Sequence, residues 1–291
     1  MVLHAAPEKL LVDTMKRLLL RGATSSLKKI VDKTHAADLS LVFRSLSQTE
    51  QRKLFGMIAD IEKKGVLLSE LDTDIFLDLA KSLDVATLAE TFEQMPTDDV
   101  ADLVGHLPQE TAEEILQRMQ HEGSEEIAGL LSYEDDTAGG IMVTDFIALG
   151  QDTTAAEAIS SLQKEHPDVE MPFYLYVVDE HQRLVGVSSL RQLVMVPPNT
   201  PLKAFMASDV FSVKTDMDQE EVAKIVARYD ILAVPVVDEQ NRLVGIVTVD
   251  DVIDIFRREA TEDILKMAGA GEEFIETKSI FRSSRIRLPW L

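Results

Sequence analysis

The sequence predicts an α + α/β protein in which an all-helical superhelical domain precedes two βαββα repeats and a C-terminal connecting helix. Three observations predict this fold class. Apolar residues recur at helical spacing up to about residue 135, an internal repeat occupies the following stretch, and an acidic helical segment comes after it. A chain of 291 residues is long enough to bury two cores.

The N-terminal region is predicted to consist of short helices joined by short turns. Residues 41–58 and 88–119 both show helical apolar spacing. Pro96 and Pro108 lie twelve residues apart, and each follows the end of one predicted helix and precedes the polar start of the next. Short helices at a nearly regular period are typical of a superhelical repeat, which usually presents a binding surface rather than a catalytic centre.

The next region contains a duplication. Residues 177–194 match residues 236–253 at an offset of 59, with eight of eighteen positions identical, and residues 142–158 resemble residues 206–222. Each copy reads as strand, helix, strand, turn, strand and helix, with polar turn residues between the last two strands. Two such units bury their sheets best against each other, so we expect one paired domain.

Composition excludes several classes of function. The net charge of −22 argues against nucleic-acid binding, which requires a basic face. The chain has no cysteine, so disulfides and thiolate metal sites are excluded. Its six histidines are scattered, and no catalytic motif is present, so we do not expect an enzyme. No apolar run approaches 18 residues, so the chain as given is not expected to cross a membrane.

The charge is unevenly distributed. Residues 98–136 contain twelve acidic residues and one strong base, Arg118, whereas residues 282–291 contain three arginines and no acid. The acidic stretch is either a solvated surface or a set of carboxylates that repel one another until a divalent cation joins them. The basic stretch is either a plain tail or the cytoplasmic edge of a transmembrane helix.

The repeats resemble a tandem cystathionine-β-synthase (CBS) domain pair. Their order, with a helical superhelix before them and an acidic helix ending in Arg-Leu-Pro-Trp-Leu after them, resembles the cytosolic portion of MgtE-type magnesium channels or transporters. The resemblance implies a helical domain at 1–136, CBS repeats at 137–200 and 201–258, and a connecting (plug) helix at 259–291. It also implies a homodimer through the CBS pairs, and a transmembrane domain that would hold this otherwise soluble chain at the cytoplasmic side of the inner membrane.

The resemblance further implies that Mg²⁺ bridges acidic residues of the helical domain, the CBS pair and the connecting helix, and so favours a closed state. The matching positions are Asp98 and Asp102 in the helical domain, Glu220, the carbonyl of Ala227 and Asp230 in the second repeat, and Asp251, Asp254, Glu259, Glu262 and Asp263 on the last helix. Arg228 stands where the family leads us to expect an acid.

The spacing of these acids fits weak Mg²⁺ sites. Mg²⁺ takes near-octahedral oxygen ligands and retains several waters. Carboxylates three or four residues apart share one helix face, as in Asp98/Asp102, Asp251/Asp254 and Glu259/Asp263. Each pair is a half-site that needs a second surface. The alternative is helix chemistry with Thr248 as N-cap and acids in the first turn, which accounts for Asp250 and in part for Asp251.

A nucleotide is the competing ligand. CBS pairs often bind adenosine phosphates through a Ser/Thr-x-x-Asp turn, which the second repeat retains from Thr248 to Asp251. In the first repeat the turn begins at Ser189 and ends in Gln192 instead of an acid. Arg191 would pair with a phosphate of ATP, and Tyr174 would either stack on the base or point into the core. The alternative function is therefore a soluble nucleotide-sensing CBS protein whose helical domain binds a partner.

Overall fold

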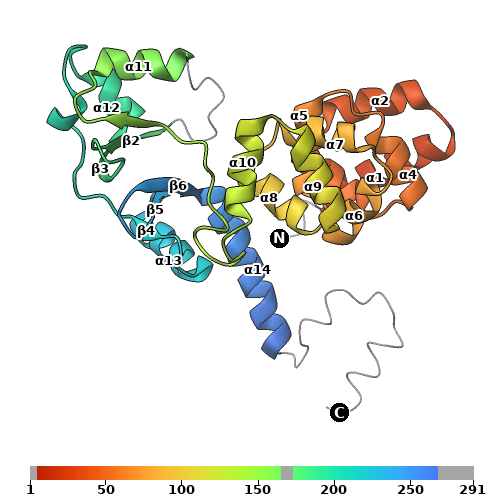
Figure 1. Ribbon diagram of the computed structural model, residues 1–291. Helices are drawn as coiled ribbons and strands as arrows, with labels where there is room; N and C mark the ends of the chain where they lie inside the picture. The colour runs from red at the N-terminus through yellow and green to blue at the C-terminus, as the bar shows by residue number, and fades with distance from the viewer. Residues whose placement is uncertain (1–4, 165–172, 268–291) are drawn as a thin grey trace. The chain divides into compact units, whose positions relative to one another are not determined.

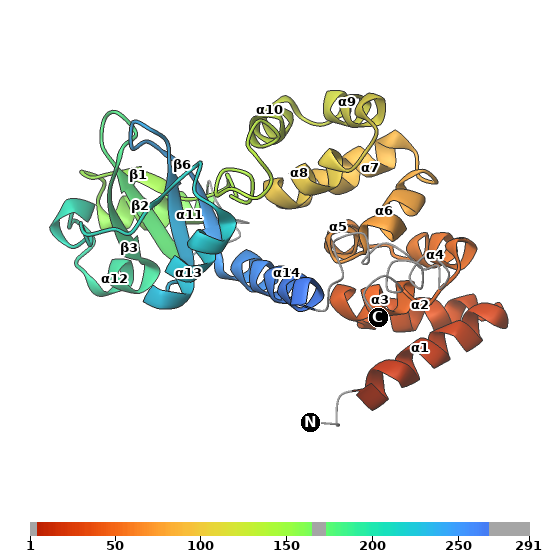
Figure 2. The same ribbon diagram turned by 90° about the horizontal axis from the view of Figure 1, so that it is seen from below.

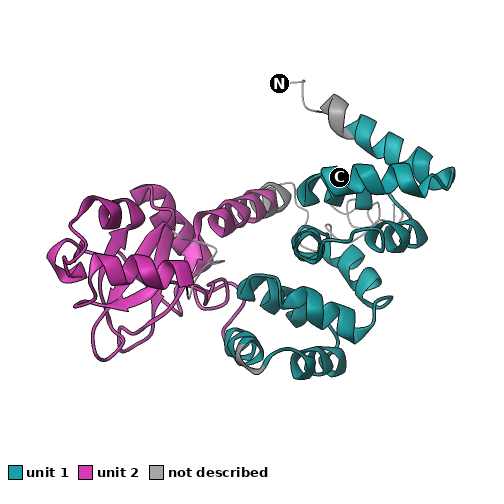
Figure 3. Cartoon of the chain, turned by 90° about the horizontal axis from the view of Figure 1, so that it is seen from above, with its two compact units in different colours: residues 1–132 teal, residues 133–291 magenta. Residues whose placement is uncertain are grey.

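The computed structural model of the chain describes residues 5–164 and 173–267 and divides into two compact units, Met1–Ser132 and Tyr133–Leu291 (Figures 1 and 3). The first unit is helical, and the second contains both sheets. Within the described residues, no helix is long and apolar enough to cross a membrane.

Unit 1 is a stack of short helices, several of which start at a capping side chain or after a proline. Ser47 and Glu50 form a capping box at one helix, and Asp84 accepts from the backbone N–H of Thr87 at 2.8 Å at another. Pro96 and Pro108 directly precede two helices, as the sequence predicts. The helices are α1 Ala5–Leu20, α2 Thr24–Lys33, α3 Ala36–Phe43, α4 Gln48–Phe55, α5 Ile61–Ser69, α6 Thr73–Ala80, α7 Val85–Phe92, α8 Thr97–Gly105, α9 Gln109–Arg118 and α10 His121–Leu130.

Helices two apart in the chain pack against each other in unit 1. The odd-numbered helices α1 to α9 form one such row, and α4 packs on α6 and α8 on α10 (Figure 2). Phe43, Phe55, Phe76 and Phe92 are fully buried between them. Because the main contacts of each described helix are with helices one to three positions away in the chain, this is the superhelical stack that the sequence predicts.

Unit 2 contains two three-stranded sheets of the same topology. In each sheet the first strand is parallel to the second, and the second is antiparallel to the third. A register shift also recurs at equivalent positions, Val177/Val178 and Val236/Val237. The elements of repeat one are β1 Ala148–Gly150, α11 Ala155–Lys164, β2 Tyr174–Val178, β3 Leu184–Ser189 and α12 Leu190–Met195, followed by the short helix η1 Leu202–Ala204. Those of repeat two are β4 Val213–Lys214, α13 Gln219–Tyr229, β5 Ala233–Val237, β6 Leu243–Thr248 and α14 Val249–Met267.

The two repeats exchange short segments across their interface. Val143, which precedes β1 of repeat one, pairs with Ile246 of repeat two through bonds of 2.8 and 3.0 Å. Ala207, which precedes β4 of repeat two, pairs with Val187 of repeat one through two bonds of 2.9 Å. These segments, together with side chains of both repeats, enclose a shared core that includes Tyr176 and Leu243. The duplicated units therefore form one domain, as predicted.

Glycine is required where the exchanged segments cross the strands. A Cβ on Gly245 would lie 2.5 Å from Sδ of Met142, and one on Gly186 would lie 2.5 Å from Sδ of Met206. The two contacts are equivalent in the two repeats. In each repeat the strand must present bare backbone so that the methionine of the other segment can lie against it.

The β-hairpin turns of the two repeats also pair with each other. Gln182 and Asn241 both have positive φ angles, of 62° and 61°. The carbonyl of Asn241 accepts from the N–H of Leu184, and the carbonyl of Gln182 accepts from the N–H of Leu243, both at 3.1 Å. The left-handed conformation thus turns each carbonyl toward the other repeat.

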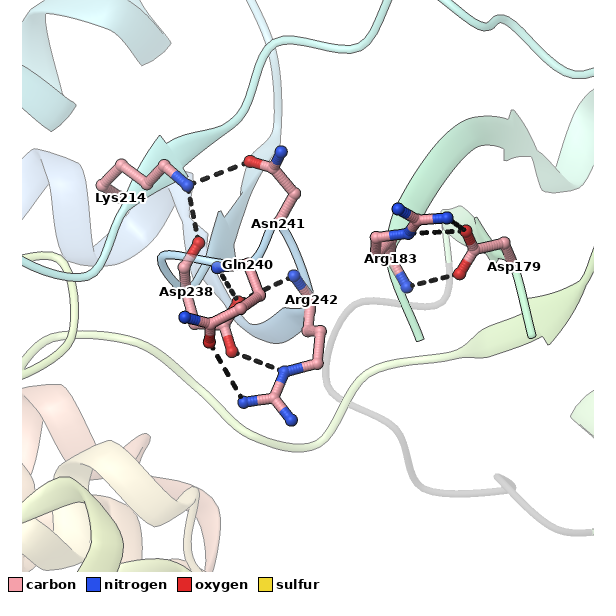
Figure 4. Close-up of polar contacts among 7 residues, drawn as sticks. All are labelled: Asp179, Arg183, Lys214, Asp238, Gln240, Asn241 and Arg242. Atoms are coloured by element: carbon pink, nitrogen blue, oxygen red, sulfur yellow. Dashed lines mark hydrogen bonds and ion pairs between the residues drawn. The ribbon is translucent and has the colours of Figure 1, made fainter. Parts of the chain in front are cut away.

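An aspartate and an arginine close each of these turns. Asp179 accepts from Nε of Arg183 at 2.8 Å, and Asp238 accepts from Nε of Arg242 at 2.7 Å (Figure 4). Hydrogen bonds from the side chain and the backbone of Arg183 lower the pKa of Asp179 to about 2. Both carboxylates also accept backbone N–H groups within their own turns, so the recurring Asp and Arg are explained by turn geometry.

Candidate metal-binding and nucleotide-binding residues

The start of α14 brings two carboxylates onto one hydroxyl. Thr248 is the last residue of β6 and is fully buried. Its Oγ1 lies 2.5 Å from Oδ1 of Asp250 and 2.5 Å from Oδ2 of Asp251, and its N–H donates to Oδ2 of Asp251 at 3.3 Å. The hydroxyl carries one hydrogen, so it satisfies only one of these carboxylates at a time.

This arrangement perturbs the Asp251 carboxylate. Burial raises its pKa to about 6, and the neighbouring charges of Asp250 and Asp254 act in the same direction against the hydrogen bonds from Thr248. At neutral pH the group is still mostly ionised. A cation close to Asp251 would relieve the repulsion that raises its pKa.

The other acids of α14 are dispersed along the helix. Asp254 is exposed and pairs with Arg257 at 3.0 Å. Glu259 is half-buried, and its Oε1 accepts from Nε2 of Gln219 on α13 at 3.1 Å. Glu262 and Asp263 also lie on α14, but their side chains are outside the described part of the structure. Asp251 and Asp254 share one face of the helix, as their spacing predicts.

The candidate ligands of α13 lie at opposite ends of that helix. Glu220 is in the first turn and pairs with Lys224, whereas Ala227 is in the last turn and Asp230 follows it. Ten residues of helix separate Glu220 from Asp230 by about 15 Å, which is too far for both to bind the same ion. Asp230 has a left-handed backbone conformation, with φ at 52°, and ends the helix.

Helices α13 and α14 run antiparallel, and this pairs the ends of the two acidic sets. Val249 at the start of α14 donates its N–H to the carbonyl of Leu232 at 2.9 Å, which brings the C-terminal end of α13 to the first turn of α14. The Gln219–Glu259 bond joins the N-terminal end of α13 to the middle of α14. Asp230 therefore lies near the start of α14, where Asp250 and Asp251 are, and Glu220 lies near the middle of α14, where Glu259 is.

Gln219 is a residue that the sequence interpretation did not identify. Its backbone N–H donates to the carbonyl of Asp136 at 2.8 Å, and its side chain bonds Glu259. It therefore links three segments: the stretch that enters unit 2, α13 and α14. No motif marks it, because a glutamine after an aspartate N-cap has no distinguishing sequence signal.

In unit 1, Asp98 and Asp102 lie one turn apart on α8. Asp98 is half-buried in the first turn, where a carboxylate is favoured by the helix dipole, and Asp102 is exposed. The backbone carbonyl of Asp102 lies 2.6 Å from Nδ1 of His106. Over the residues that the structure describes, no group of three or more acidic or histidine side chains is close enough to hold a metal ion.

The candidate nucleotide residues occupy three different environments. Tyr174 begins β2 opposite Ser189 and packs, half-buried, against the core shared by the two repeats. Arg191 is exposed on α12. Thr248 is buried, and its hydroxyl is already bonded to the carboxylates described above. Of these three side chains, Arg191 alone is exposed.

The Ser/Thr-x-x-Asp turn acts as a helix cap in both repeats. At α12, Ser189 and Gln192 form a capping box, with the N–H of Ser189 donating to Oε1 of Gln192 at 2.9 Å. Thr248 and Asp251 make the corresponding bond at α14. Gln192 of the first repeat therefore makes the same capping bond as Asp251 of the second repeat, but without a negative charge.

This fold and its duplicated turns define a CBS-domain pair preceded by a helical domain. Residues 34–136 match the MgtE intracellular N domain, and residues 138–199 and 189–258 match the CBS domain. The chain thus combines the N domain of the MgtE family with a CBS-domain pair in the predicted order, which confirms the predicted resemblance and fold class.

Two curated relatives extend beyond the length of this chain. Magnesium transporter MgtE of Thermus thermophilus is 37% identical over 263 residues, which are 89% of this chain and 58% of the relative. Magnesium transporter MgtE of Bacillus subtilis is 34% identical over 275 residues, which are 94% of this chain and 60% of the relative. The chain thus spans less than two thirds of the length of either transporter.

Two solved structures match nearly over their whole length. The crystal structure of the soluble part of a magnesium transporter has a TM-score of 0.75 at 30% identity and covers 87% of this chain and 99% of its own. The cytosolic domain of the Mg²⁺ channel MgtE in complex with ATP has a TM-score of 0.79 at 34% identity and covers 84% of this chain and 99% of its own.

The raised pKa of Asp251 gives a pH-dependent prediction. The folded-state pKa of about 6 exceeds the unfolded value, so the folded state binds the proton more tightly. As the pH rises from about 4 to about 6, the wild type therefore loses stability that Asp251→Asn does not lose. In EDTA, we expect the free energy of unfolding of the variant to rise relative to that of the wild type by at most about 1.4 kcal/mol for each unit of pH increase in this window. Urea unfolding at several pH values measures the difference. A constant difference from pH 4 to pH 7 would contradict the assignment.

Proposed function

We propose that this chain is the cytosolic Mg²⁺-sensing and gating region of an MgtE-type magnesium channel or transporter. Its own transmembrane domain would hold it at the cytoplasmic side of the inner membrane. The family supports this, as do the greater lengths of the two transporters. We propose domain boundaries after residues 136, 200 and 258, so that α14 passes from the second CBS repeat into the connecting helix.

One observation carries the proposal: the acidic residues form small half-sites on separate elements. Asp98 and Asp102 are on α8, Asp230 adjoins the first turn of α14, and Glu220 is grouped with Glu259. None of these groups can enclose an ion alone. Mg²⁺ needs only one or two carboxylates besides its waters, so a second surface brought close to any half-site would complete it.

The mechanism is a linkage between ion occupancy and closure. Without Mg²⁺ the carboxylates repel one another, and the helical domain and CBS pair separate. With Mg²⁺ the ions join Asp98 and Asp102 to the CBS surface and the connecting helix, and the closed state is favoured. An ion shifts this equilibrium only by its differential affinity for the two states, so several weak sites act together.

A second copy of the chain is the proposed partner of the CBS pair. Large apolar side chains are exposed at equivalent positions of both repeats, 59 residues apart: Phe173 and Leu232, and Val194 and Ile253. Phe211 and Tyr229 are also exposed and stack with ring centroids 3.9 Å apart. Exposed apolar surface that recurs in both repeats is suited to a self-complementary dimer interface.

Mg²⁺ is expected to compact the chain. Small-angle scattering should show a smaller radius of gyration in millimolar Mg²⁺ than in EDTA. The triple change Asp98→Asn, Asp102→Asn and Asp251→Asn should raise the Mg²⁺ midpoint by about tenfold or more, because it removes charge from two half-sites.

The matched control for this experiment keeps the candidate ligands. Glu113→Gln with Glu114→Gln neutralises exposed acids on α9 and should leave the midpoint within about twofold, because screening alone acts weakly over such distances. The proposal fails if the wild type does not compact, or if the control shifts the midpoint as much as the triple variant.

ATP is a second proposed ligand, supported by the ATP complex of a neighbour of similar fold. Calorimetry should detect ATP binding that Arg191→Ala weakens by about tenfold, because a charged phosphate partner is lost. Lys164→Ala, an exposed cation on α11, is the control. Tight ATP binding without any response to Mg²⁺ would instead favour the alternative, a soluble nucleotide-sensing CBS protein with a partner-binding helical domain.

The dimer is tested by changing its proposed apolar surface. Val194→Asp with Ile253→Asp should raise the dissociation constant of the dimer by at least about tenfold, because each change places a charge in the interface. Sedimentation velocity measures this shift toward monomer. Val66→Asp, an exposed apolar position on α5 of unit 1, should leave the dimer intact. A wild type that is monomeric at high concentration refutes this part of the proposal.

A further inference from the structure

Unit 1 carries opposite charge at its two ends. Residues 5–64 contain twelve Lys or Arg against seven Asp or Glu, a net charge of +5. Residues 65–132 contain two Lys or Arg against sixteen Asp or Glu, a net charge of −14. The N-terminal end of the stack is therefore a basic surface in a strongly acidic chain. The proposed Mg²⁺ sites use the acidic end and leave this basic end unexplained.

Six of these twelve cations lie on the outer helices α1 and α2, and Arg21 lies in the turn between them. Helix α1 packs on α2 and α3 and forms the end of the stack (Figure 2). Two acids, Asp13 and Asp32, are also exposed on these helices. The exposed cations are Lys9, Arg17, Arg21, Lys28, Lys29 and Lys33. Ion pairs of described residues in unit 1 use Arg44, Lys81 and Arg118 and none of these six.

Apolar side chains lie among these cations. Leu20 is 81% exposed and Leu10 is 65% exposed, both on α1. Lys9, Arg17 and Leu20 are spaced so that they share one face of the helix. A terminal helix of a repeat stack needs a polar outer face for solubility, but that requirement explains neither the positive sign nor the two exposed leucines.

We propose that this basic end, formed by the outward faces of α1 and α2, binds a bilayer surface that carries anionic lipid headgroups. Lysine and arginine are attracted to such a surface, and apolar side chains between them enter its headgroup region. The acidic end does not prevent this, because screening confines the relevant field to about 10 Å at 0.1 M salt. The inference rests on the proposed function, which keeps the chain beside a membrane where a weak contact suffices.

Two other partners fit the observations less well. A nucleic acid would be repelled by the net charge of −22 and would gain nothing from exposed leucines. The acidic end of a second copy complements the charge, but such a head-to-tail contact is heterologous and would form a ring or an open chain rather than a self-complementary dimer. Both partners are outcomes of the test below.

The test is co-sedimentation of the chain with phosphatidylcholine vesicles containing about one third phosphatidylglycerol. It is performed in EDTA, so that no divalent ion bridges acidic residues to lipid and the result is independent of Mg²⁺ sensing. The chain should bind these vesicles, should not bind pure phosphatidylcholine, and should be released by salt. Inorganic phosphate at the same ionic strength should not compete, because the surface recognises a bilayer and not a free anion.

Two matched pairs of variants locate the contact. Lys28→Glu with Lys29→Glu should lower the partition coefficient by about tenfold or more, whereas Lys81→Glu with Arg118→Glu, the same change of net charge at the other end of unit 1, should not. Leu20→Ser should lower it several-fold, and Val66→Ser should not. Circular dichroism confirms that each variant is folded.

Several results would overturn the inference. They are a wild type that does not bind the anionic vesicles, equal losses in the two charge pairs, and tighter binding to duplex DNA than to vesicles. A loss of self-association rather than of vesicle binding in Lys28→Glu with Lys29→Glu would assign the basic end to a second copy. Failure of Mg²⁺-dependent compaction, by contrast, would refute the proposed function and leave vesicle binding in EDTA unchanged.

Discussion

The reciprocal pairing of the two CBS repeats is the constraint on which unit 2 depends. Val143 completes the sheet of repeat two, and Ala207 completes that of repeat one. The left-handed turns at Gln182 and Asn241 add a second exchange. Each sheet thus gains an edge contact from the other repeat, so repeat two, which includes α13 and α14, is completed only in the pair. The candidate metal residues of this unit lie on these two helices or directly after α13.

The proposed Mg²⁺ sensing depends on incomplete sites. A preformed cage of carboxylates would bind an ion tightly and respond poorly to changes in concentration. In the proposed mechanism, the surface that completes a dispersed half-site on α8 or α14 sets its affinity for the ion, and this would link occupancy to conformation. Asp251 shows the energetic cost of such an arrangement. Burial and two neighbouring carboxylates raise its pKa, so its ionised form is disfavoured in the folded chain.

Much of the architecture could be predicted from the sequence because it is encoded in local periods. Pro96 and Pro108 mark helix starts by their own covalent geometry, and the repeat at an offset of 59 predicts two matching sheets. The contacts of the candidate site were harder to predict from the sequence. Spacing places Asp251 and Asp254 on one face, but the burial of Thr248 and the bond from Gln219 to Glu259 depend on how α13 packs on α14. Such contacts between distant segments leave no periodic signal.

The exchanged segments also dictate an order of events during synthesis. A chain grows from its N-terminus, and domains generally fold as soon as their residues have emerged. Repeat one cannot cover the edge of its sheet at Val187 until Ala207 has left the ribosome, and Val143 must wait for Ile246. The two repeats therefore reach their native state together and late, whereas unit 1, built from near-neighbour contacts, can complete its folding first.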